Sequence, residues 1–368
     1  MNTKTKNIVV SIVMAVVLFG LSAWCWFRPS DDFSDSERRT LAQFPEVSVD
    51  TVMSGKFMTE FETYTLDQFP LRDGFRRIKA IASLYGFFNL DNNDIYVSNG
   101  HISKLEYPMS TQMLDHVSER FEYLYNTYLS ENENVYFCIV PDKNYFLAGE
   151  RGHLALDYDL LISEMKDRTD YMKPIDIIEY LDINDYYYTD THWRQENIRD
   201  IAAAIAGKMG VTLSAEYEEK TLDHPFYGVY YGQSALPFAP DTIKYLTNDM
   251  LENCTVTSYN TGMPQKTTMY NMDKATSRDP YEMFLGGADP LIVIENPAAT
   301  SDRELVVFRD SFGSSLVPLL VEAYSKVTVV DTRYMQSELV GNFVEFNSNQ
   351  DVLFMYSTML LNNSLAIR

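Results

Sequence analysis

The chain has 368 residues, of which 46% are hydrophobic and 14% aromatic, and this length is enough for one large or two modest domains with a sizeable core. Its 52 acidic and 30 basic residues give a formal net charge of −22, and so acidic a surface repels phosphate backbones, which argues against nucleic acid as a partner. The five histidines form neither an HExxH motif nor a cluster, so the sequence predicts no protein metal site.

The N-terminus carries the pattern of a membrane anchor. Lys4 and Lys6 precede an uncharged apolar segment over residues 8–27, and a helix of about 20 residues spans the roughly 30 Å hydrocarbon core of a bilayer. The positive end should remain in the cytoplasm, which places everything after Arg28 outside it. Because the apolar run is longer than that of a signal peptide and the cleavage site is poor, we expect residues 1–27 to be a cytoplasmic tip and an uncleaved, single-pass transmembrane signal anchor.

Residues 28–56 are polar and acidic and lack periodicity, which predicts a stalk. We expect one extracytoplasmic domain to follow over residues 57–368. Its first part, residues 57–84, has helical periodicity that Pro70 interrupts. Further on we expect a hairpin turn at Asn99-Gly100, a helix over 110–130, a strand over 135–140 and a helix that ends at Gly210.

Residues 211–290 differ from the rest, because they are rich in Tyr, Thr, Asn and Gly and show no sustained helical period. We expect an irregular, partly β insertion there. Regular alternation then resumes, with strands expected over 291–294, 305–308, 327–330 and 352–356 and helices over 314–324 and 338–345. Apolar strands that alternate with helices predict an α/β fold with a mostly parallel sheet and helices on both faces.

Two cysteines, Cys138 and Cys254, lie beyond the apolar N-terminal segment. They would pair in an oxidising compartment, or they remain buried free thiols, since Cys138 lies inside a strand-like apolar run. The sequence leaves both alternatives open.

A polar break after the strand at 305–308 contains a candidate nucleophile, Ser311. An apolar run spaced for a helix follows Gly313, so the order predicts a buried strand, a tight turn and a helix, with the Ser311 hydroxyl at the carboxyl edge of the sheet. The backbone N–H groups after Ser311 would point out of a helix N-terminus and could hold an oxyanion. The alternative is that Ser311 only caps the helix.

Asp190 and His192 lie just before the helix predicted to begin near Arg194. In an extended segment, side chains two residues apart leave on the same side. A carboxylate beside an imidazole fixes its tautomer, and a hydroxyl on the other nitrogen completes a Ser-His-Asp relay, for which Ser311 is available. The alternative is that Asp190 only caps the helix and His192 is a loop histidine, and spacing alone does not decide whether the two stretches meet.

The stretch Asp190-Thr191-His192-Trp193, followed by Arg309-Asp310-Ser311-Phe312-Gly313, resembles the DHHW protein family, which is similar to the alginate O-acetyltransferases of the SGNH-hydrolase-like superfamily. The chain departs from the family's name at Thr191, where the name implies histidine, whereas the alginate enzymes need only Asp-x-His. The resemblance to the family also includes residues 36–41, 54–57, 67–72, 141–145, 330–334 and the closing strand at 351–357.

The resemblance implies an SGNH-hydrolase-like fold with Ser311 as nucleophile, His192 as general acid and base, and Asp190 as the residue that orients it. It implies an extracytoplasmic, membrane-anchored O-acetyltransferase that acts on a cell-surface or secreted polysaccharide and needs no cofactor. Because acetyl-CoA is cytoplasmic, the implied partner is a membrane-bound O-acyltransferase that supplies the acetyl group. An acetyl (carbohydrate) esterase with the same triad and a non-catalytic polysaccharide-binding or scaffold subunit remain alternatives.

Four further residues are weaker candidates for substrate binding. Arg333 follows a strand end and Lys143 closes another, so each could bind an anionic or hydroxyl-rich ligand or form a surface ion pair. Gly287, after Gly286, would let the backbone approach Ser311 as an oxyanion donor or would form a plain turn. Trp193, at the end of the Asp-x-His motif, is the fourth candidate.

Overall fold

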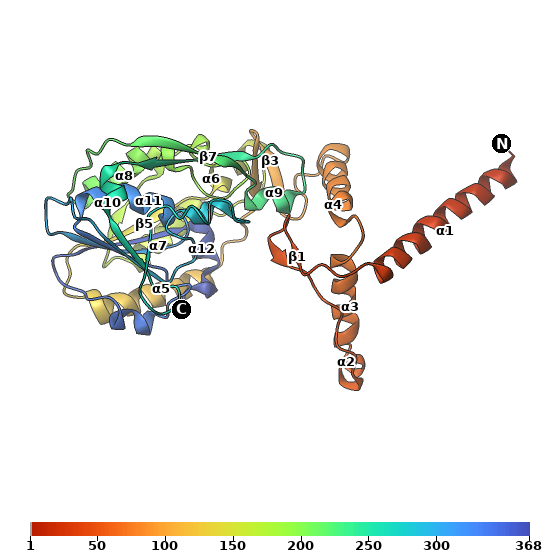
Figure 1. The fold of residues 1–368 in the computed structure, drawn as a ribbon, viewed down its shortest axis with the longest axis horizontal. Helices are drawn as coiled ribbons and strands as arrows, with labels where there is room; N and C mark the ends of the chain where they lie inside the picture. Colours follow the sequence, from red (N-terminus) through yellow and green to blue (C-terminus); the bar gives the residue numbers. More distant parts are fainter. Residues whose placement is uncertain (1) are drawn as a thin grey trace. The chain divides into compact units, whose positions relative to one another are not determined.

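A computed structural model describes residues 2–368 and divides the chain into two compact units (Figure 1). The N-terminal unit holds the chain up to Asn92 together with Tyr231–Pro237. The sheet unit holds Asn93–Tyr230 and Phe238–Arg368. This division differs from the predicted start of the large domain at residue 57, because the helices that follow residue 56 pack within the N-terminal unit.

The N-terminal unit begins with α1 (Thr3–Phe27), which is long and apolar enough to cross a membrane and has no buried residue. The expected break at Pro70 is confirmed, since it separates α3 (Lys56–Asp67) from α4 (Arg72–Ile81). Residues 28–56, predicted as a stalk, are tied to α3 in the structure, because Arg39 Nη1 donates to Asp67 Oδ2 at 2.8 Å. The other elements of this unit are β1 (Phe33–Ser34), β2 (Arg39–Thr40), α2 (Val49–Met53), α3 (Lys56–Asp67), α4 (Arg72–Ile81) and a π turn (Ala82–Gly86).

The sheet unit is built on eight strands in the order β10-β9-β11-β13-β12-β14-β5-β6. The strands from β13 to β6 are parallel, whereas β10, β9 and β11 pair antiparallel. The predicted mostly parallel α/β sheet is therefore confirmed. The strand bounds are β5 (Val135–Val140), β6 (Lys173–Ile175), β9 (Thr255–Ser258), β10 (Gln265–Thr267), β11 (Leu291–Glu295), β12 (Glu304–Arg309), β13 (Lys326–Val330) and β14 (Asp351–Ser357).

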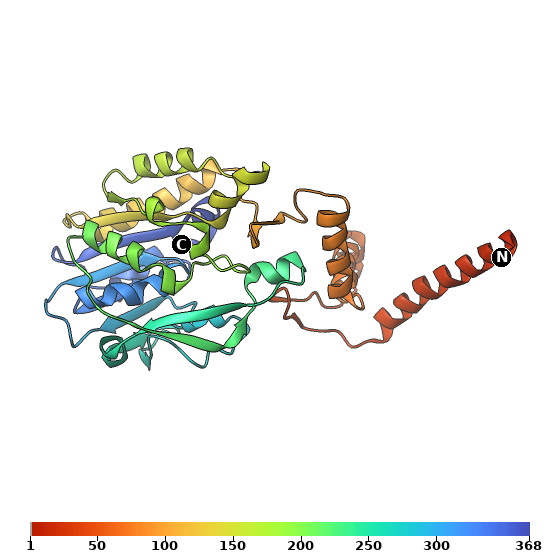
Figure 2. The same cartoon turned by 90° about the horizontal axis from the view of Figure 1, so that it is seen from above.

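Helices cover both faces of this sheet, and the central strands are buried on both sides (Figure 2). On β14, Phe354 packs into one core cluster and its neighbour Met355 into the other. A strand buried on both faces reads as a continuous apolar run, which is why these strands are visible in the sequence. One cluster includes residues of α5 (Thr111–Leu124), α7 (Tyr158–Arg168) and α12 (Thr358–Asn362), and the other includes residues of α8 (Arg199–Lys208) and α11 (Gly313–Leu320).

The predicted insertion at 211–290 is partly β, but it is not separate from the sheet. Its strands β9 and β10 extend the main sheet, because β9 pairs along the free edge of β11. The predicted helix over 338–345 is a 3₁₀ stretch, Ser337–Asn342. The remaining strands and α-helices are the hairpin of β3 (Ile95–Ser98) and β4 (His101–Lys104), α6 (Lys143–Arg151), the hairpin of β7 (Glu218–Phe226) and β8 (Asp241–Thr247), α9 (Val229–Ser234) and α10 (Asp249–Asn253).

The two cysteines of the sheet unit are unpaired thiols in the structure. Cys138 lies on β5 and is fully buried, and Cys254 donates from Sγ to the Met250 carbonyl at 3.3 Å. The structure therefore corresponds to the free-thiol alternative.

Candidate active site

The turn between β12 and α11 presents Ser311 at the carboxyl edge of the sheet, where the strand-turn-helix pattern predicts it. Asp310 holds the turn, because its Oδ1 accepts from the Phe312 N–H at 3.0 Å and its Oδ2 from the Ser357 N–H, on the neighbouring strand, at 2.8 Å. Gly313 is required for space, since a Cβ there would lie 2.7 Å from the Cβ of Arg309. The turn that carries Ser311 is thus bonded to Ser357 on β14 and packs closely against Arg309 on β12.

The backbone N–H groups after Ser311 are not available in the way the sequence predicted. The Phe312 N–H is taken by the Asp310 carboxylate, the Gly313 N–H by the Asp310 carbonyl at 3.1 Å and the Ser314 N–H by the Ser311 carbonyl at 3.2 Å. The N–H of Ser311 itself has no hydrogen-bond partner within residues 2–368. The free backbone donor of this turn therefore belongs to the nucleophile itself.

Asp190 and His192 approach one another through a local turn rather than through an extended strand. The Oδ1 of Asp190 accepts from the backbone N–H of His192 at 3.0 Å and lies 2.6 Å from its Nδ1. The loop is closed by the Tyr187 N–H, which donates to the His192 carbonyl at 3.1 Å. The two residues therefore meet as predicted, but the reason is turn geometry and not strand alternation.

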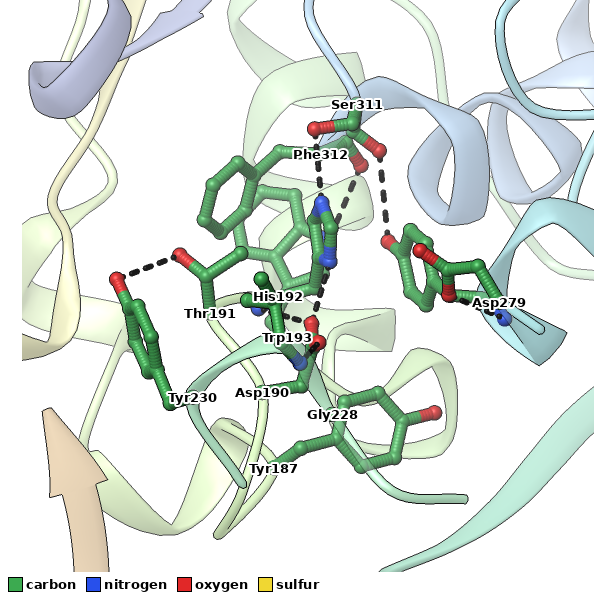
Figure 3. A network of polar contacts seen from close by, with 12 residues as sticks. Tyr187, Asp190, Thr191, His192, Trp193, Gly228, Tyr230, Asp279, Ser311 and Phe312 are labelled. Carbon is green, nitrogen blue, oxygen red and sulfur yellow. Dashed lines mark hydrogen bonds and ion pairs between the residues drawn. The ribbon is translucent and has the colours of Figure 1, made fainter. Parts of the chain in front are cut away.

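The two stretches meet in space, and they form a continuous Ser-His-Asp relay (Figure 3). His192 Nε2 lies 2.7 Å from Ser311 Oγ, and its Nδ1 lies 2.6 Å from Asp190 Oδ1. Asp190 and His192 are buried, and Ser311 is partly exposed. A hydroxyl on one imidazole nitrogen and a buried carboxylate on the other is the arrangement that activates a serine for attack on an acyl group.

The carboxylate of Asp190 is held in its ionised form by its surroundings. Its Oδ2 accepts from the Val229 N–H at 2.8 Å, and a Cβ on Gly228 would lie only 2.4 Å from the Asp190 Cα. Burial by itself raises the pKa of Asp190, but the His192 charge and the hydrogen bonds from His192 and Val229 together lower this pKa well below its usual range. Asp190 can therefore orient the imidazole and stabilise the imidazolium.

Asp241, on β8, holds the loop that carries Asp190 and His192 by accepting hydrogen bonds from Thr189. Asp241 Oδ2 accepts from the Thr189 hydroxyl at 2.6 Å and from its N–H at 2.7 Å. The Thr189 hydroxyl in turn accepts from the Gly228 N–H at 3.0 Å. Thr191, at the position where the family's name implies histidine, faces away from the relay and accepts from the Tyr230 hydroxyl at 3.3 Å (Figure 3).

Two aromatic side chains fix the position of His192 relative to the turn that carries Ser311. The ring of Tyr281 stacks on His192 with centroids 3.9 Å apart and planes 7° apart, and its hydroxyl lies 2.8 Å from Ser315 Oγ. Trp193 is fully buried and donates from Nε1 to Ser315 Oγ at 2.9 Å and to the Phe312 carbonyl at 3.1 Å. Trp193 was a candidate for substrate binding, but in the structure it ties the His192 loop to the serine turn.

Lys143 also differs from the prediction, because it is neither a surface residue nor open to a ligand. It is buried, and its Nζ donates to the backbone carbonyls of Ile102 at 2.6 Å, Tyr187 at 2.8 Å, and Tyr188 and Asp190 at 3.1 Å. Burial lowers the pKa of Lys143 to about 7, against the opposing effect of two nearby carboxylates. An ammonium group with three N–H donors is saturated by these acceptors, so Lys143 braces the relay loop.

Arg333 and Gly287 likewise have internal partners. The guanidinium of Arg333 donates to both carboxylate oxygens of Asp331, at 2.9 and 2.6 Å, and Asp331 also accepts from Arg309 Nη1 at 3.2 Å. The Gly287 N–H donates to the Phe284 carbonyl at 3.2 Å, and its own carbonyl accepts from Arg309 Nη2 at 3.2 Å. The structure therefore corresponds to the alternatives left open by the sequence, an ion pair for Arg333 and a turn for Gly287, and both residues support Arg309 beside the serine turn.

Fold and site together define an α/β protein with a Ser-His-Asp arrangement at the carboxyl edge of its sheet. Residues 175–330 match the model of the family described as "DHHW protein", so the resemblance is confirmed over this part of the chain, which contains all three relay residues. No curated protein matches the sequence significantly.

Solved structures show the same fold. A DHHW family protein from Eubacterium siraeum has a TM-score of 0.58 at 20% identity, over 75% of this chain and 95% of its own. PatB1 from Bacillus cereus, solved with a sulfonyl adduct, has a TM-score of 0.56 at 18% identity, over 73% of this chain and 97% of its own. The O-acetyltransferase domain of Pseudomonas putida AlgJ reaches a TM-score of 0.43 at 12% identity, over 74% of this chain and 93% of its own.

The residues that brace the relay are the part of the site that sequence reasoning missed. Tyr281, Gly228 and Asp241 all come from the region 211–290, where no regular period singles out a position. The one available signal is Gly228, a glycine among tyrosines, since a glycine often marks a close approach of the backbone. Nothing in the sequence distinguishes Tyr281 from the other tyrosines.

Proposed function

We propose that this chain is a serine O-acyltransferase in which Ser311 carries the acyl group, His192 moves the proton and Asp190 orients His192. The observation that supports this proposal is the unbroken relay, 2.7 Å from Ser311 Oγ to His192 Nε2 and 2.6 Å from His192 Nδ1 to Asp190 Oδ1. Both distances are within the hydrogen-bond range that proton transfer requires.

The reaction proceeds in two half-steps. Ser311 Oγ attacks the carbonyl carbon of an acyl ester or thioester while its proton passes to His192 Nε2. The tetrahedral intermediate then collapses, and the leaving alcohol or thiol takes that proton, so an acyl-serine remains. In the second half-step an acceptor hydroxyl attacks the acyl-serine, gives its proton to His192 Nε2, and releases Ser311 with its proton restored.

The oxyanion formed in each half-step needs donors that are in place beforehand. The unpaired N–H of Ser311 is one such donor, and it lies immediately before the N-terminus of α11, where the helix dipole favours negative charge. In this proposal the residues after Ser311 keep the turn rigid through Asp310, and they do not hold the oxyanion.

The acyl group is proposed to be acetyl and the acceptor a cell-surface or secreted polysaccharide, and both choices rest on the resemblance to the DHHW family. The apolar helix α1 supports attachment to a membrane, and the proposed orientation places the sheet unit outside the cytoplasm. The acetyl donor would then be handed across the membrane by a membrane-bound O-acyltransferase.

The experiment uses the full chain in lipid nanodiscs with p-nitrophenyl acetate as acetyl donor and intact-mass spectrometry as the readout. The wild type should gain the mass of one acetyl group, and Ser311→Ala should not. Ser314→Ala is the matched control, because this buried serine lies three residues along the same turn and helix, and we expect it to be acetylated like the wild type. A panel of oligosaccharides is then added to the acetylated protein.

The outcomes separate the functions. Faster loss of the acetyl group with one class of sugar, and transfer of its mass to that sugar, supports the acyltransferase. Loss at a rate that no sugar changes would favour the esterase, because water is then the acceptor. The absence of any Ser311-dependent adduct, both with p-nitrophenyl acetate and with a sulfonyl fluoride of the kind that the PatB1 adduct suggests, would contradict a catalytic role.

A further inference from the structure

Helix α4 and the π turn that follows it carry an apolar face that is largely exposed, although Phe75 packs edge-on against Phe69 with ring centroids 5.5 Å apart. Leu71, Phe75, Ile78 and Tyr85 recur at helical spacing, and they are between 46% and 65% exposed. Phe87 and Phe88, directly after the π turn, are more exposed still. Large apolar side chains normally avoid such exposure together, and a contiguous patch of this kind marks an interaction surface.

The opposite side of α4 is fixed, so the helix cannot roll to bury this face. Ala80 is completely buried, and Arg76 Nη2 donates to the Gly232 carbonyl at 2.8 Å. Arg72 pairs with Glu37 on the same side. The exposed face is therefore a lasting feature of the N-terminal unit.

The start of this face lies beside the end of the anchor helix. Cys25 Sγ lies 3.9 Å from the Gln68 carbonyl, and Trp24 and Leu71 line the same surface hollow. Gln68 is tied to the segment after α1, because its Oε1 accepts from the Asp31 N–H at 2.9 Å and its Nε2 donates to the Asp31 carbonyl at 2.8 Å. These contacts hold the α3–α4 elbow next to the part of α1 where interfacial aromatic residues are expected.

The composition of α4 fits the boundary between lipid and water. Its exposed apolar face is flanked by Arg77 and Lys79, so that a narrow apolar stripe has a basic residue on each side. Phenylalanine and tyrosine on the apolar side with Arg and Lys beside it are typical of helices that lie in the plane of the membrane interface. The placement beside Trp24 and this composition are independent observations, and both indicate lipid.

We propose that the face of α4 formed by Leu71, Phe75, Ile78 and Tyr85 lies in the interfacial region of the same bilayer that α1 spans. The N-terminal unit is then attached at two places, by a spanning helix and by a helix that lies on the surface. This inference rests on the membrane attachment in the proposed function, but not on the chemistry of Ser311.

The test measures the depth of spin labels on the full chain in phosphatidylcholine nanodiscs. Cys25 and Cys254 are replaced by serine, the fully buried Cys138 is kept, and a single label is placed in turn at Ile78→Cys, at Val13→Cys in the anchor and at Met263→Cys in the sheet unit. Met263 is the matched control, because it is 68% exposed and Ile78 is 65% exposed. The readout is the rate of label collisions with oxygen, which concentrates in lipid, relative to a nickel chelate, which stays in water.

We expect the labels at residues 13 and 78 to collide more with oxygen than with the nickel chelate, and the label at 263 to do the reverse. A label at 78 as water-exposed as the label at 263, with the label at 13 in lipid, would overturn this inference and leave the anchor intact. A label at 78 shielded from both reagents would also overturn it, in favour of a second copy or another protein. A label at 13 in water would refute the anchor and this inference together.

Discussion

The stack of Tyr281 on His192 predicts a measurable loss of acylation when the ring is removed. At 3.9 Å and 7° the ring fixes the plane of the imidazole, and its hydroxyl separately bonds Ser315. Tyr281→Phe keeps the ring and removes only the hydroxyl, whereas Tyr281→Leu removes the stack as well. An aromatic pair contributes about 0.5–1.5 kcal/mol beyond its buried area. If that energy orients His192, Tyr281→Leu should acylate Ser311 about 2- to 13-fold more slowly than Tyr281→Phe.

The assay is the pre-steady-state burst of p-nitrophenol from p-nitrophenyl acetate, which reports the acylation of Ser311. Thermal unfolding of both variants is measured in parallel, so that the rate comparison is made well below the melting temperature of either. A merely structural role would lower the melting temperature of Tyr281→Leu and leave its acylation rate equal to that of Tyr281→Phe. Equal rates in the folded state would therefore refute the positioning role.

Four further predictions concern Asp190 and the residues that surround the relay. Gly228→Ala should lower both the unfolding free energy and the acylation rate, because its Cβ would lie 2.4 Å from the Asp190 Cα. The control Gly207→Ala has open space around it in α8 and should raise the unfolding free energy by about 0.5–1 kcal/mol in chemical denaturation. Lys143→Met leaves buried carbonyls unpaired and should lower the unfolding free energy by about 2–4 kcal/mol, while the exposed control Lys166→Met should change it by less than about 0.5 kcal/mol. Asp190→Asn should slow acylation by about 10³- to 10⁴-fold with the fold retained. The pKa of Asp190 is lowered in the folded protein, so its carboxylate stabilises the fold above about pH 4 and loses this effect as the pH falls. The difference in melting temperature between wild type and Asp190→Asn should therefore shrink on acidification.

The sheet was predictable from the sequence to the extent that its strands are buried on both faces. Val135–Val140 and Glu304–Arg309 read as short apolar runs bounded by polar residues, and the structure places a strand at each. Thr255–Ser258 and Gln265–Thr267 were not predicted as strands of the main sheet, since they are short, polar and half-exposed. Their place is decided by pairing with β11, which is a tertiary effect that no local pattern shows.

The candidate site, like the sheet, could be predicted from the sequence only in part. The relay residues could be identified because their types are those that the chemistry requires, and the strand-turn-helix pattern placed Ser311 correctly. The roles of Lys143 and Trp193 could not be identified, because a lysine or a tryptophan beside a motif looks the same whether it faces a ligand or the interior. In the structure both are buried and bond to backbone groups of the site, so burial decided what the sequence left open.

The activation of Ser311 by His192 is tested by locating the acetyl group on the chain. The full chain is treated with p-nitrophenyl acetate, digested, and mapped by tandem mass spectrometry alongside His192→Ala. This role of His192 predicts acetyl on the peptide that contains Ser311 in the wild type and none there in His192→Ala, which retains the serine but lacks the base. Acetyl on other residues only, or equal acetylation of Ser311 in both proteins, would contradict it.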